Sequence, residues 1–352
     1  MNKKVKPYLI TRSLQPENQE SPIHFIKNME TPLHYFYRRN HFPYPVLNQY
    51  NYWLQVAVGQ SKKRYIHLSE LLAMPATTLT VPLECAGNKR AKFSTKVYGE
   101  QWEDGAISQG EWTGVPLRNL LKDTELTMEA QEIVFEGADR GKKPGNEGLV
   151  PYKRSLPLEK ALHPDTLVAY KYNNKPLTVK HGHPFRLIVP NWYAMASVKW
   201  LQKIEIIKHK FTGPFQTEDY MYYPNKNNNQ EKVPVTTLNV NSTIQQPLNY
   251  SILNSGTHKV EGIAWTGQGK IKEVQVSFDN GQTWTKANLS SNGDSVYSWI
   301  HWSLVCEFNN KGEYTILSRA VDSSGRVQPH TPFWNRKGYG FNAVSTVHVK
   351  VE

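Results

Sequence analysis

The sequence has few cysteines, no long apolar run and no strongly basic tract. Its 352 residues include two cysteines, Cys85 and Cys306, which excludes a disulfide-rich scaffold and a cysteine-rich zinc site. No apolar stretch approaches the roughly 20 residues that cross a membrane. The first residues lack both the hydrophobic segment of a secretory signal and a twin-arginine leader. We therefore expect a cytoplasmic protein with no membrane partner.

The charge is not balanced, because the formal net charge is +12. Such an excess attracts anions. A nucleic acid is one candidate, but the sequence shows no basic run, helix-turn-helix, zinc finger or aromatic RNA-binding motif, so we expect no nucleic-acid partner. A small anionic substrate drawn in by a basic funnel explains the charge equally well.

Length and pattern predict two domains. Residues 1–234 mix helical and strand signals, which indicates an α+β domain. Short apolar runs bounded by glycine, proline or asparagine predict buried strands at Ile133–Phe135, Leu167–Tyr170 and Leu187–Val189. Pro116, followed by leucines, predicts the first turn of a helix.

Residues 235–352 are predicted to form an all-β, immunoglobulin-like sandwich. The polar, turn-rich segment 222–234 separates this part from the first domain. Apolar and polar residues alternate over 273–278, and the Asp-Asn-Gly sequence at 279–281 then predicts a tight hairpin. Regular short strands and turns of this kind are typical of an antiparallel sandwich.

One segment, residues 81–90 (VPLECAGNKR), carries most of the chemical information. A strand-like run ends at Cys85, and small residues follow where the backbone must approach another group closely. Arg90 is a cation within one loop of the thiol, and a nearby cation favours the thiolate that ligates metals. One soft thiolate is a poor zinc site but suffices when a cofactor supplies other sulfurs. On these residues alone, a buried structural cysteine and a Cys-His hydrolase both stay open.

The segment ECAGNKR resembles the Cys-Ala-Gly-Asn-Arg-Arg signature of the sulfite oxidase family, molybdopterin-dependent oxidoreductases whose cysteine is the protein's ligand to molybdenum. Other segments resemble the family in the same order along the chain. They are Tyr37–Pro43 (YRRNHFP), His181–Arg186 (HGHPFR), Ser197–Leu201 (SVKWL) and Glu218–Tyr220 (EDY). The second domain is similar to the family's dimerisation domain. The resemblance covers nearly the whole chain, and the chain is most similar to the bacterial, haem-free type of member.

This resemblance implies a molybdenum–molybdopterin cofactor and assigns roles to residues of each segment. Cys85 would bind the metal, while Tyr220, Arg39 and Arg90 would act on the substrate. The implied cofactor-binding residues are Tyr37, Arg38, Arg39, Asn40, His41, Asp139, His181, Arg186, Ser197, Val198 and Lys199. Taken singly, each also has an ordinary structural explanation, such as a surface ion pair for an arginine or a turn for Asp139. Cys306 matches no catalytic segment and is expected in the core.

The activity that the resemblance implies is oxidation of sulfite to sulfate by oxo transfer. No haem or flavin module is recognised, so the electrons would pass to a separate acceptor. Two alternatives stay open: reduction of a sulfoxide or nitrate on the same cofactor, and a molybdopterin- or anion-binding protein without turnover. Similar sulfoxide reductases generally lack the second domain, which favours the oxidase.

The second domain is expected to form a homodimer, because the resemblance points there and closed symmetric pairs are the commonest oligomers. Large aromatic residues are also enriched at interfaces. This domain has five tryptophans that could lie there or inside the sandwich: Trp265, Trp284, Trp299, Trp302 and Trp334. The animal and plant enzymes of the family that this chain resembles have an arginine near the end of this domain, after an Asn-Ala-Trp run. Residues 342–346 have none, so one anion contact is expected to be missing.

Overall fold

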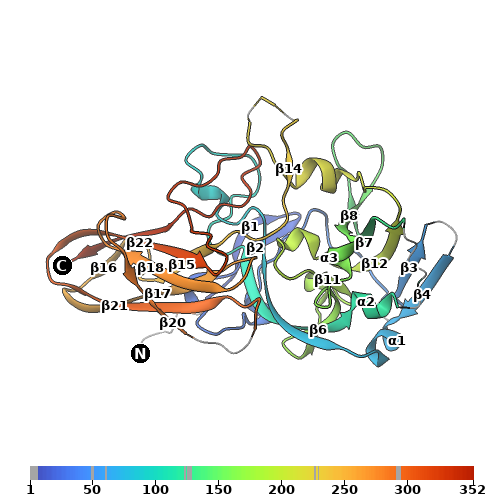
Figure 1. Ribbon diagram of the computed structural model, residues 1–352, viewed down its shortest axis with the longest axis horizontal. Coiled ribbons are helices and arrows are strands. Elements are labelled where there is room, and N and C mark those ends of the chain that lie inside the picture. Colours follow the sequence, from blue (N-terminus) through green and yellow to red (C-terminus); the bar gives the residue numbers. More distant parts are fainter. Residues whose placement is uncertain are drawn as a thin grey trace.

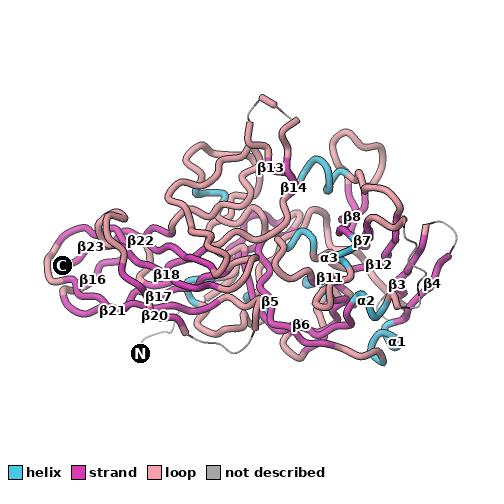
Figure 2. The backbone as a smooth tube through the Cα atoms, in the orientation of Figure 1, coloured by secondary structure: helices cyan, strands magenta, loops and turns pink. Residues whose placement is uncertain are grey.

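The fold is that of a computed structural model, which describes residues 7–48, 51–59, 62–122, 124, 129–225, 227–228, 230–290 and 295–352. Figure 1 shows a sandwich of orange and red strands on the left and the earlier part of the chain, blue to yellow, on the right. A two-stranded hairpin near the N-terminus, β1 (Ile10–Leu14) and β2 (Glu17–Glu20), lies between the two. Figure 2 shows how much of the chain runs in loops between short elements.

Two five-stranded sheets form the framework of the first part. One has the order β10-β9-β6-β5, with β11 also paired to β9; its strands are β5 (Thr77–Glu84), β6 (Ile107–Pro116), β9 (Leu167–Tyr172), β10 (Lys175–Pro176) and β11 (Arg186–Ile188). The other has the order β4-β3-β12-β7-β8; its strands are β3 (Trp53–Val58), β4 (Lys62–His67), β7 (Glu132–Gly141), β8 (Val150–Pro157) and β12 (Leu201–Ile207). The predicted apolar runs lie in β7, β9 and, except for Val189, β11.

The helices of the first part are short. Among the residues that the structure describes, the α-helices are α1 (Leu68–Ala73), α2 (Leu117–Leu120) and α3 (Leu158–Ala161). The other helical turns are η1 (Ile23–Phe25), η2 (Leu33–Tyr35), η3 (Arg90–Lys92), η4 (Val179–His181), η5 (Ala194–Ala196) and the π-helix η6 (Phe215–Asp219). Pro116 precedes α2 as expected, because its ring fixes a backbone angle suited to the first turn. Among the described residues no helix is both long and apolar enough to cross a bilayer.

The last part of the chain forms a sandwich of two sheets, which confirms the predicted all-β architecture. A small pair, β13 (Met221–Tyr222) and β14 (Val233–Pro234), precedes it. The first sheet has the order β15-β17-β21-β20, with strands β15 (Asn241–Gln246), β17 (Gly256–Trp265), β20 (Asn288–Leu289) and β21 (Ile300–Phe308). The second has the order β16-β23-β22-β18-β19, with strands β16 (Ser251–Leu253), β18 (Ile271–Ser277), β19 (Thr285–Lys286), β22 (Gly312–Asp322) and β23 (Ser345–Val351).

The two parts share packed surface. Trp265 and Trp299 come from the sandwich, yet both are fully buried in the main core of the first part. Trp302 belongs to the core of the sandwich itself. Three of the five tryptophans therefore lie inside the protein and give no support to a dimer. Cys306 packs against the sandwich core but is only half-buried, so its expected core position is met in part.

Candidate active site

A cavity opens where the chain leaves β5 at Cys85. Its empty space is about 680 Å³ when the open solvent at its mouth is included. The residues that line it are Phe36, Tyr37, Arg39, Asn40, His41, Cys85, Ala86, Asp139, Tyr152, Lys180, His181, Arg186, Ala194, Met195, Ser197, Val198, Lys199, Trp200 and Tyr220. They come from seven separate stretches of the chain. Most of the residues singled out in the sequence are thus brought to one place.

Cys85 is a free thiol held at the end of a strand. Its backbone N–H donates to the carbonyl of Ala106 at 2.9 Å, and its carbonyl accepts from Asn88 N–H at 2.9 Å. Burial raises the pKa of the thiol, while the charges of Arg39 and Arg90 act in the opposite direction. The described residues contain no cluster of three or more His, Cys, Asp or Glu that could hold a metal. A metal bound to Cys85 therefore needs ligands from another molecule.

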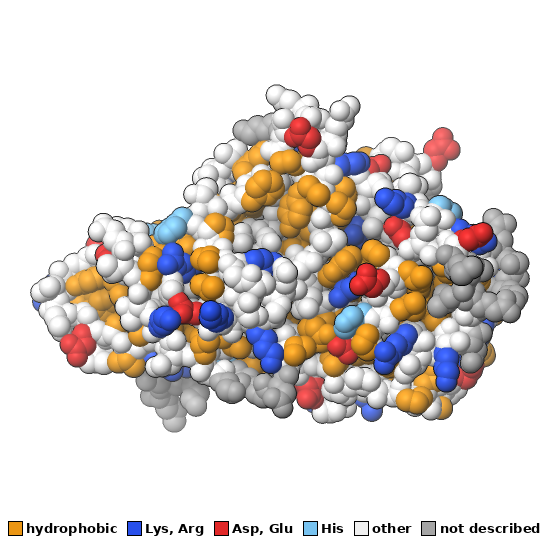
Figure 3. Space-filling view, viewed as in Figure 1, with side chains coloured by type: hydrophobic (Ala, Val, Ile, Leu, Met, Phe, Trp, Pro, Cys, Tyr) orange, Lys and Arg blue, Asp and Glu red, His pale blue; other side chains and the backbone are white. Residues whose placement is uncertain are grey.

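The cavity wall is strongly basic. Arg39, Lys180, Arg186 and Lys199 line it, against the single carboxylate of Asp139. Burial and the nearby Arg186 charge lower the pKa of the Lys199 amine, and Asp139 opposes this effect. Because an anion would favour the charged form of each basic side chain, the wall is suited to an anionic ligand. Figure 3 shows that on the visible outer face basic and acidic side chains are, by contrast, interspersed.

Two buried polar atoms of the wall have no hydrogen-bond partner among the described residues: Nε2 of His181 and Nε of Arg186. The other groups of these side chains are occupied, since His181 Nδ1 lies 2.7 Å from Thr178 Oγ1 and the Arg186 guanidinium donates to the His181 carbonyl at 3.0 Å. Gly182, with φ +103°, leaves no room for a side chain, because a Cβ there would lie 3.1 Å from Arg186 and Lys199. Unsatisfied buried polar atoms are costly, so these groups fit a polar ligand such as a pterin with its phosphate.

Tyr220, His41 and Arg39 form a connected group beside Cys85 in the wall. His41 Nε2 lies 2.7 Å from the Tyr220 hydroxyl, and the Arg39 guanidinium lies 3.1 Å from His41 Nδ1. Burial and surrounding positive charge keep the pKa of His41 well below its usual range, so the ring is neutral. The same Arg39 nitrogen also lies 3.3 Å from His41 Nε2, so the tautomer of the ring sets which of the Tyr220 and His41 groups donates.

Two of the expected residues do not line the cavity. Arg38 turns outward and donates to Glu17 at 3.0 Å and Gln19 at 2.6 Å. Arg90 is buried behind Cys85, where its guanidinium donates to the Glu100 carbonyl at 2.8 Å and the Lys337 carbonyl at 3.1 Å. Its plane lies over the Tyr339 ring at 5.2 Å. Arg90 can therefore reach a ligand in this geometry through its charge and not through a direct contact.

Asp139 lies where β7 shifts register between Glu136 and Arg140, so a bulge and not a turn directs its side chain into the cavity. Several wall residues were given no role from the sequence: Phe36, Ala86, Tyr152, Lys180, Ala194, Met195 and Trp200. Ala86 and Trp200 lie within the motif segments, while Phe36 and Lys180 adjoin expected residues, and adjacency is the signal that could have indicated them. Tyr152, from β8, carries no such signal; its hydroxyl donates to the Met195 carbonyl at 2.8 Å.

Comparison with known proteins agrees with this geometry. Residues 41–215 match the oxidoreductase molybdopterin-binding domain, and residues 232–352 match the Mo-co oxidoreductase dimerisation domain. The fold and site are thus those of a molybdopterin-dependent oxidoreductase.

Individual relatives narrow the class. The chain is 33% identical to mitochondrial sulfite oxidase of Mus musculus, over 98% of its own length and 66% of that protein. It is 32% identical to sulfite oxidase of Gallus gallus, over 94% of its length and 76% of that protein. It is 30% identical to nitrate reductase [NADH] 2 of Phaseolus vulgaris, but spans only 40% of it. The crystal structure of the sulfane dehydrogenase SoxCD from Paracoccus pantotrophus superposes with a TM-score of 0.82 at 26% identity, covering 98% of this chain and 86% of that one. The chain belongs to the sulfite oxidase family.

Proposed function

We propose that this molybdoenzyme oxidises sulfite to sulfate at a molybdenum–molybdopterin centre ligated by Cys85. The observation that carries the proposal is a single buried thiol in a cavity lined by four basic side chains and one carboxylate. A dianion gains most from such a wall, because Coulomb attraction in a partly dehydrated pocket exceeds its value in bulk water. The similarity to sulfite oxidases supports the choice of substrate.

The cofactor would be held by residues that already face the cavity. Cys85 would ligate the metal, and the unpartnered Nε2 of His181 and Nε of Arg186 would bind the pterin. Lys199 would bind its phosphate. The rest of the proposed cofactor-binding set is Tyr37, Arg39, Asn40, His41, Asp139, Ser197 and Val198; Arg38 would act by holding Glu17 and Gln19 beside this wall. When bound, the molybdenum–pterin group supplies the two-electron redox chemistry and the oxygen transfer.

The residues beside Cys85 would bind and orient the substrate. Arg39 would hold sulfite oxygens through its planar fork of donors. Burial raises the pKa of Tyr220 although Arg39 opposes this, so the phenol stays protonated and can donate a hydrogen bond to the anion. Neutral His41 would hold the Tyr220 hydroxyl in place through their 2.7 Å contact. Arg90 would add positive charge behind the thiol. Overall, sulfite and water give sulfate, two protons and two electrons.

The remaining parts of the proposal concern the assembly. Residues 1–234 would be the catalytic domain and residues 235–352 the dimerisation domain of a homodimer, in keeping with the matched family models. Molybdenum–molybdopterin would be the cofactor, without haem or flavin, and the electrons would pass to a separate acceptor in the cytoplasm. Sedimentation equilibrium of the full chain should give twice the mass of one chain; a monomer at micromolar concentration would contradict the dimer.

The activity is tested on purified full-length protein. Metal analysis should find one molybdenum per chain, and sulfite should bleach the oxidised spectrum and support reduction of ferricyanide. Protein that contains molybdenum but neither bleaches nor turns over with sulfite would refute the substrate. Protein without molybdenum, purified from cells that make the cofactor, would refute the centre itself.

A second candidate is reduction of nitrate or of a sulfoxide on the same cofactor. The identity to a nitrate reductase favours keeping it, although the chain spans less than half of that protein. The two directions are separated by one pair of assays: sulfite with ferricyanide against nitrate or a sulfoxide with a reduced dye. The larger kcat/KM identifies the function.

A further inference from the structure

The loop that carries Cys85 is held from both sides by the last part of the chain. Directly before the cysteine, Glu84 accepts a hydrogen bond from Trp265 Nε1 at 2.8 Å. Directly after it, the Ala86 carbonyl accepts from Gly340 N–H at 2.8 Å. Trp265 and Gly340 both belong to residues 235–352. The position of Cys85 therefore depends on the sandwich, not on the first part of the chain alone.

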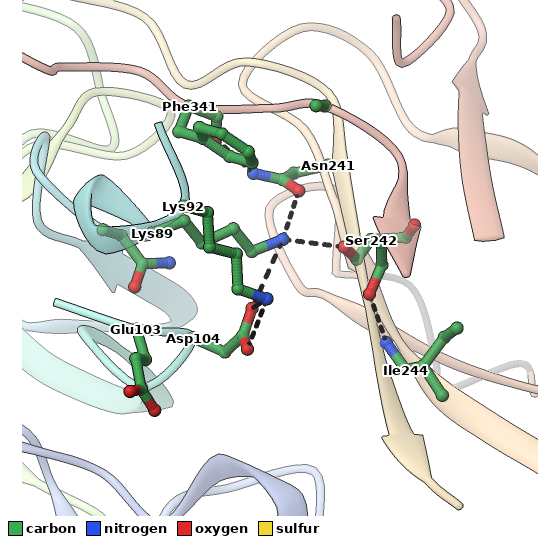
Figure 4. Close-up of polar contacts among 12 residues, drawn as sticks. Lys89, Lys92, Glu103, Asp104, Asn241, Ser242, Ile244 and Phe341 are labelled. Carbon is green, nitrogen blue, oxygen red and sulfur yellow. Dashed lines mark hydrogen bonds and ion pairs between the residues drawn. The ribbon is translucent and has the colours of Figure 1, made fainter. Parts of the chain in front are cut away.

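Lys89 makes a further contact of this kind. Its ammonium crosses the boundary and donates to Asn241 Oδ1 at 2.7 Å and to the Ser242 carbonyl at 2.8 Å, at the start of β15 (Figure 4). The side chain is 1% exposed, and Asp104 Oδ1 lies 4.0 Å from its nitrogen. Asn241 is itself fixed, because its amide donates to the Phe341 carbonyl at 3.0 Å. The lysine thus docks on a rigid acceptor pair.

The backbone transmits this contact to Cys85 and Arg90. Three tight turns follow one another, in which Asn88, Arg90 and Lys92 N–H groups donate to the carbonyls of Cys85, Gly87 and Lys89. Lys89 itself has φ +62°, a left-handed conformation that the surrounding contacts must hold in place. A shift of Lys89 would move both of its functional neighbours.

We propose that Lys89 is a positioning residue, which fixes Cys85 at the cavity and Arg90 behind it by locking their loop onto Asn241 and Ser242 of the sandwich. The proposal rests on the proposed function for the roles of Cys85 and Arg90. It also gives residues 235–352 a task within their own chain: they complete the active site from behind. A buried charge that loses its partners is strongly destabilising, so the loop has few alternative arrangements.

Lys92 provides a matched control. It comes from the same loop and contacts the same carboxylate, since its ammonium lies 2.7 Å from both oxygens of Asp104 (Figure 4). None of the hydrogen bonds described for it reaches the sandwich. Lys92→Met therefore removes a charge from Asp104 while leaving the lock in place, whereas Lys89→Met removes the lock and leaves Asp104 its closer contact with Lys92.

The experiment compares full-length holoenzymes carrying Lys89→Met, Lys92→Met, Lys89→Arg and Asn241→Ala. Hydrogen–deuterium exchange of peptides covering residues 84–92 should be roughly tenfold faster in Lys89→Met, the scale of losing a hydrogen bond from a charged group. The KM for sulfite should rise more than kcat falls, because Arg90 is displaced together with the loop. Lys92→Met should match wild type in both readouts. Lys89→Arg, which restores a cation of similar reach, should recover most of the loss.

Asn241→Ala removes the acceptor instead of the donor and keeps the test decisive if Lys89→Met does not fold. Wild-type exchange in the loop of either variant, or equal effects of Lys89→Met and Lys92→Met, would overturn the proposal. A different result would be faster exchange in the variants while the wild-type protein does not oxidise sulfite at all. It would leave the lock in place and refute only the proposed function, because exchange does not depend on turnover.

Discussion

The protein buries basic side chains in two neighbouring places, and it treats them differently. Around Lys89 every buried charge has a partner: the ammonium has two acceptors, and Asp104 is shared with Lys92. Burial alone would raise the pKa of Asp104, but the two lysines hold it at about 2. In the cavity, His181 Nε2 and Arg186 Nε have no partner among the described residues.

This difference separates structure from function. A buried polar group without a partner is costly, so an incomplete set of partners on a cavity wall fits a ligand that completes it. The Lys89 cluster is complete without any ligand and fixes a loop. The cavity is incomplete and carries excess positive charge, which is the condition for binding an anionic cofactor and an anionic substrate. Substitutions in the Lys89 cluster should therefore affect the loop, whereas substitutions in the cavity wall should affect ligand binding.

The largest effect is expected from removing the thiol. Cys85→Ser should still bind the pterin through the basic wall but lose nearly all turnover, because an oxygen ligand is harder than sulfur and changes the electronic structure of the metal. Pterin content and steady-state rate with sulfite measure the two properties. Cys306→Ser, on β21 and remote from the cavity, is the matched control and should keep the wild-type rate. A Cys85→Ser enzyme with most of its rate would remove this thiol from the metal.

The next effect is expected from the substrate cations. Arg39→Met should raise the KM for sulfite roughly tenfold or more, the scale of a charge-assisted contact of about 1.5–3 kcal/mol. Arg90→Met should raise it less, because Arg90 acts on the cavity through its charge. Arg140→Met, half-exposed at the end of β7, controls for loss of a positive charge. Steady-state kinetics with ferricyanide give all three constants, and equal constants for Arg39→Met and Arg140→Met would contradict the assignment.

The sequence predicted the parts of this arrangement that lie in contiguous segments. Cys85, His181 and Lys199 were expected from their motifs, and the alternation over 273–278 indicated β18 of the sandwich. Contacts across the chain could not be predicted in this way. Nothing local in Lys89 indicates that it reaches Asn241, 152 residues later.

Local reasoning also failed where tertiary packing decides the direction of a side chain. Arg38 and Arg39 are adjacent in the same motif, but Arg38 pairs with Glu17 away from the cavity, whereas Arg39 lines the cavity. The Tyr152 position depends on β8 packing beside η5, which no pattern in the sequence reveals. Asp139 was expected to contact the cofactor and it lines the cavity, but the bulge that directs it there depends on its partner strand.

A smaller effect is expected from the titration of His181. Burial and the nearby Lys199 and Arg186 charges lower its pKa to about 3, so the folded, cofactor-free chain keeps it neutral where the unfolded chain takes up a proton. The unfolded state therefore binds more protons below its ordinary pKa of about 6.5, and stability falls as the pH drops. Between pH 7 and 5 His181 should cost about 2 kcal/mol.

The measurement is the difference in unfolding free energy between wild type and His181→Gln in urea at several pH values. The difference cancels the titration of the other carboxylates and histidines. As the pH falls from 7 to 5, the unfolding free energy of wild type should decrease relative to that of the variant. A difference that stays constant over this range would show that His181 is protonated in the fold or exposed to solvent.

The smallest effect is expected from screening. The net charge of +12 and the basic wall should draw sulfite toward the cavity, and salt weakens such steering because the Debye length falls from about 10 Å at 0.1 M to about 3 Å at 1 M. The second-order rate constant for bleaching by sulfite should therefore fall with added potassium chloride, while the limiting rate at saturating sulfite should change little. Stopped-flow reduction measures both without ferricyanide, whose own charge would otherwise respond to salt. A second-order constant independent of ionic strength would show that the charge excess does not assist binding. Added salt should not disturb the Lys89 loop, because the buried Lys89 ammonium contacts its two acceptors directly.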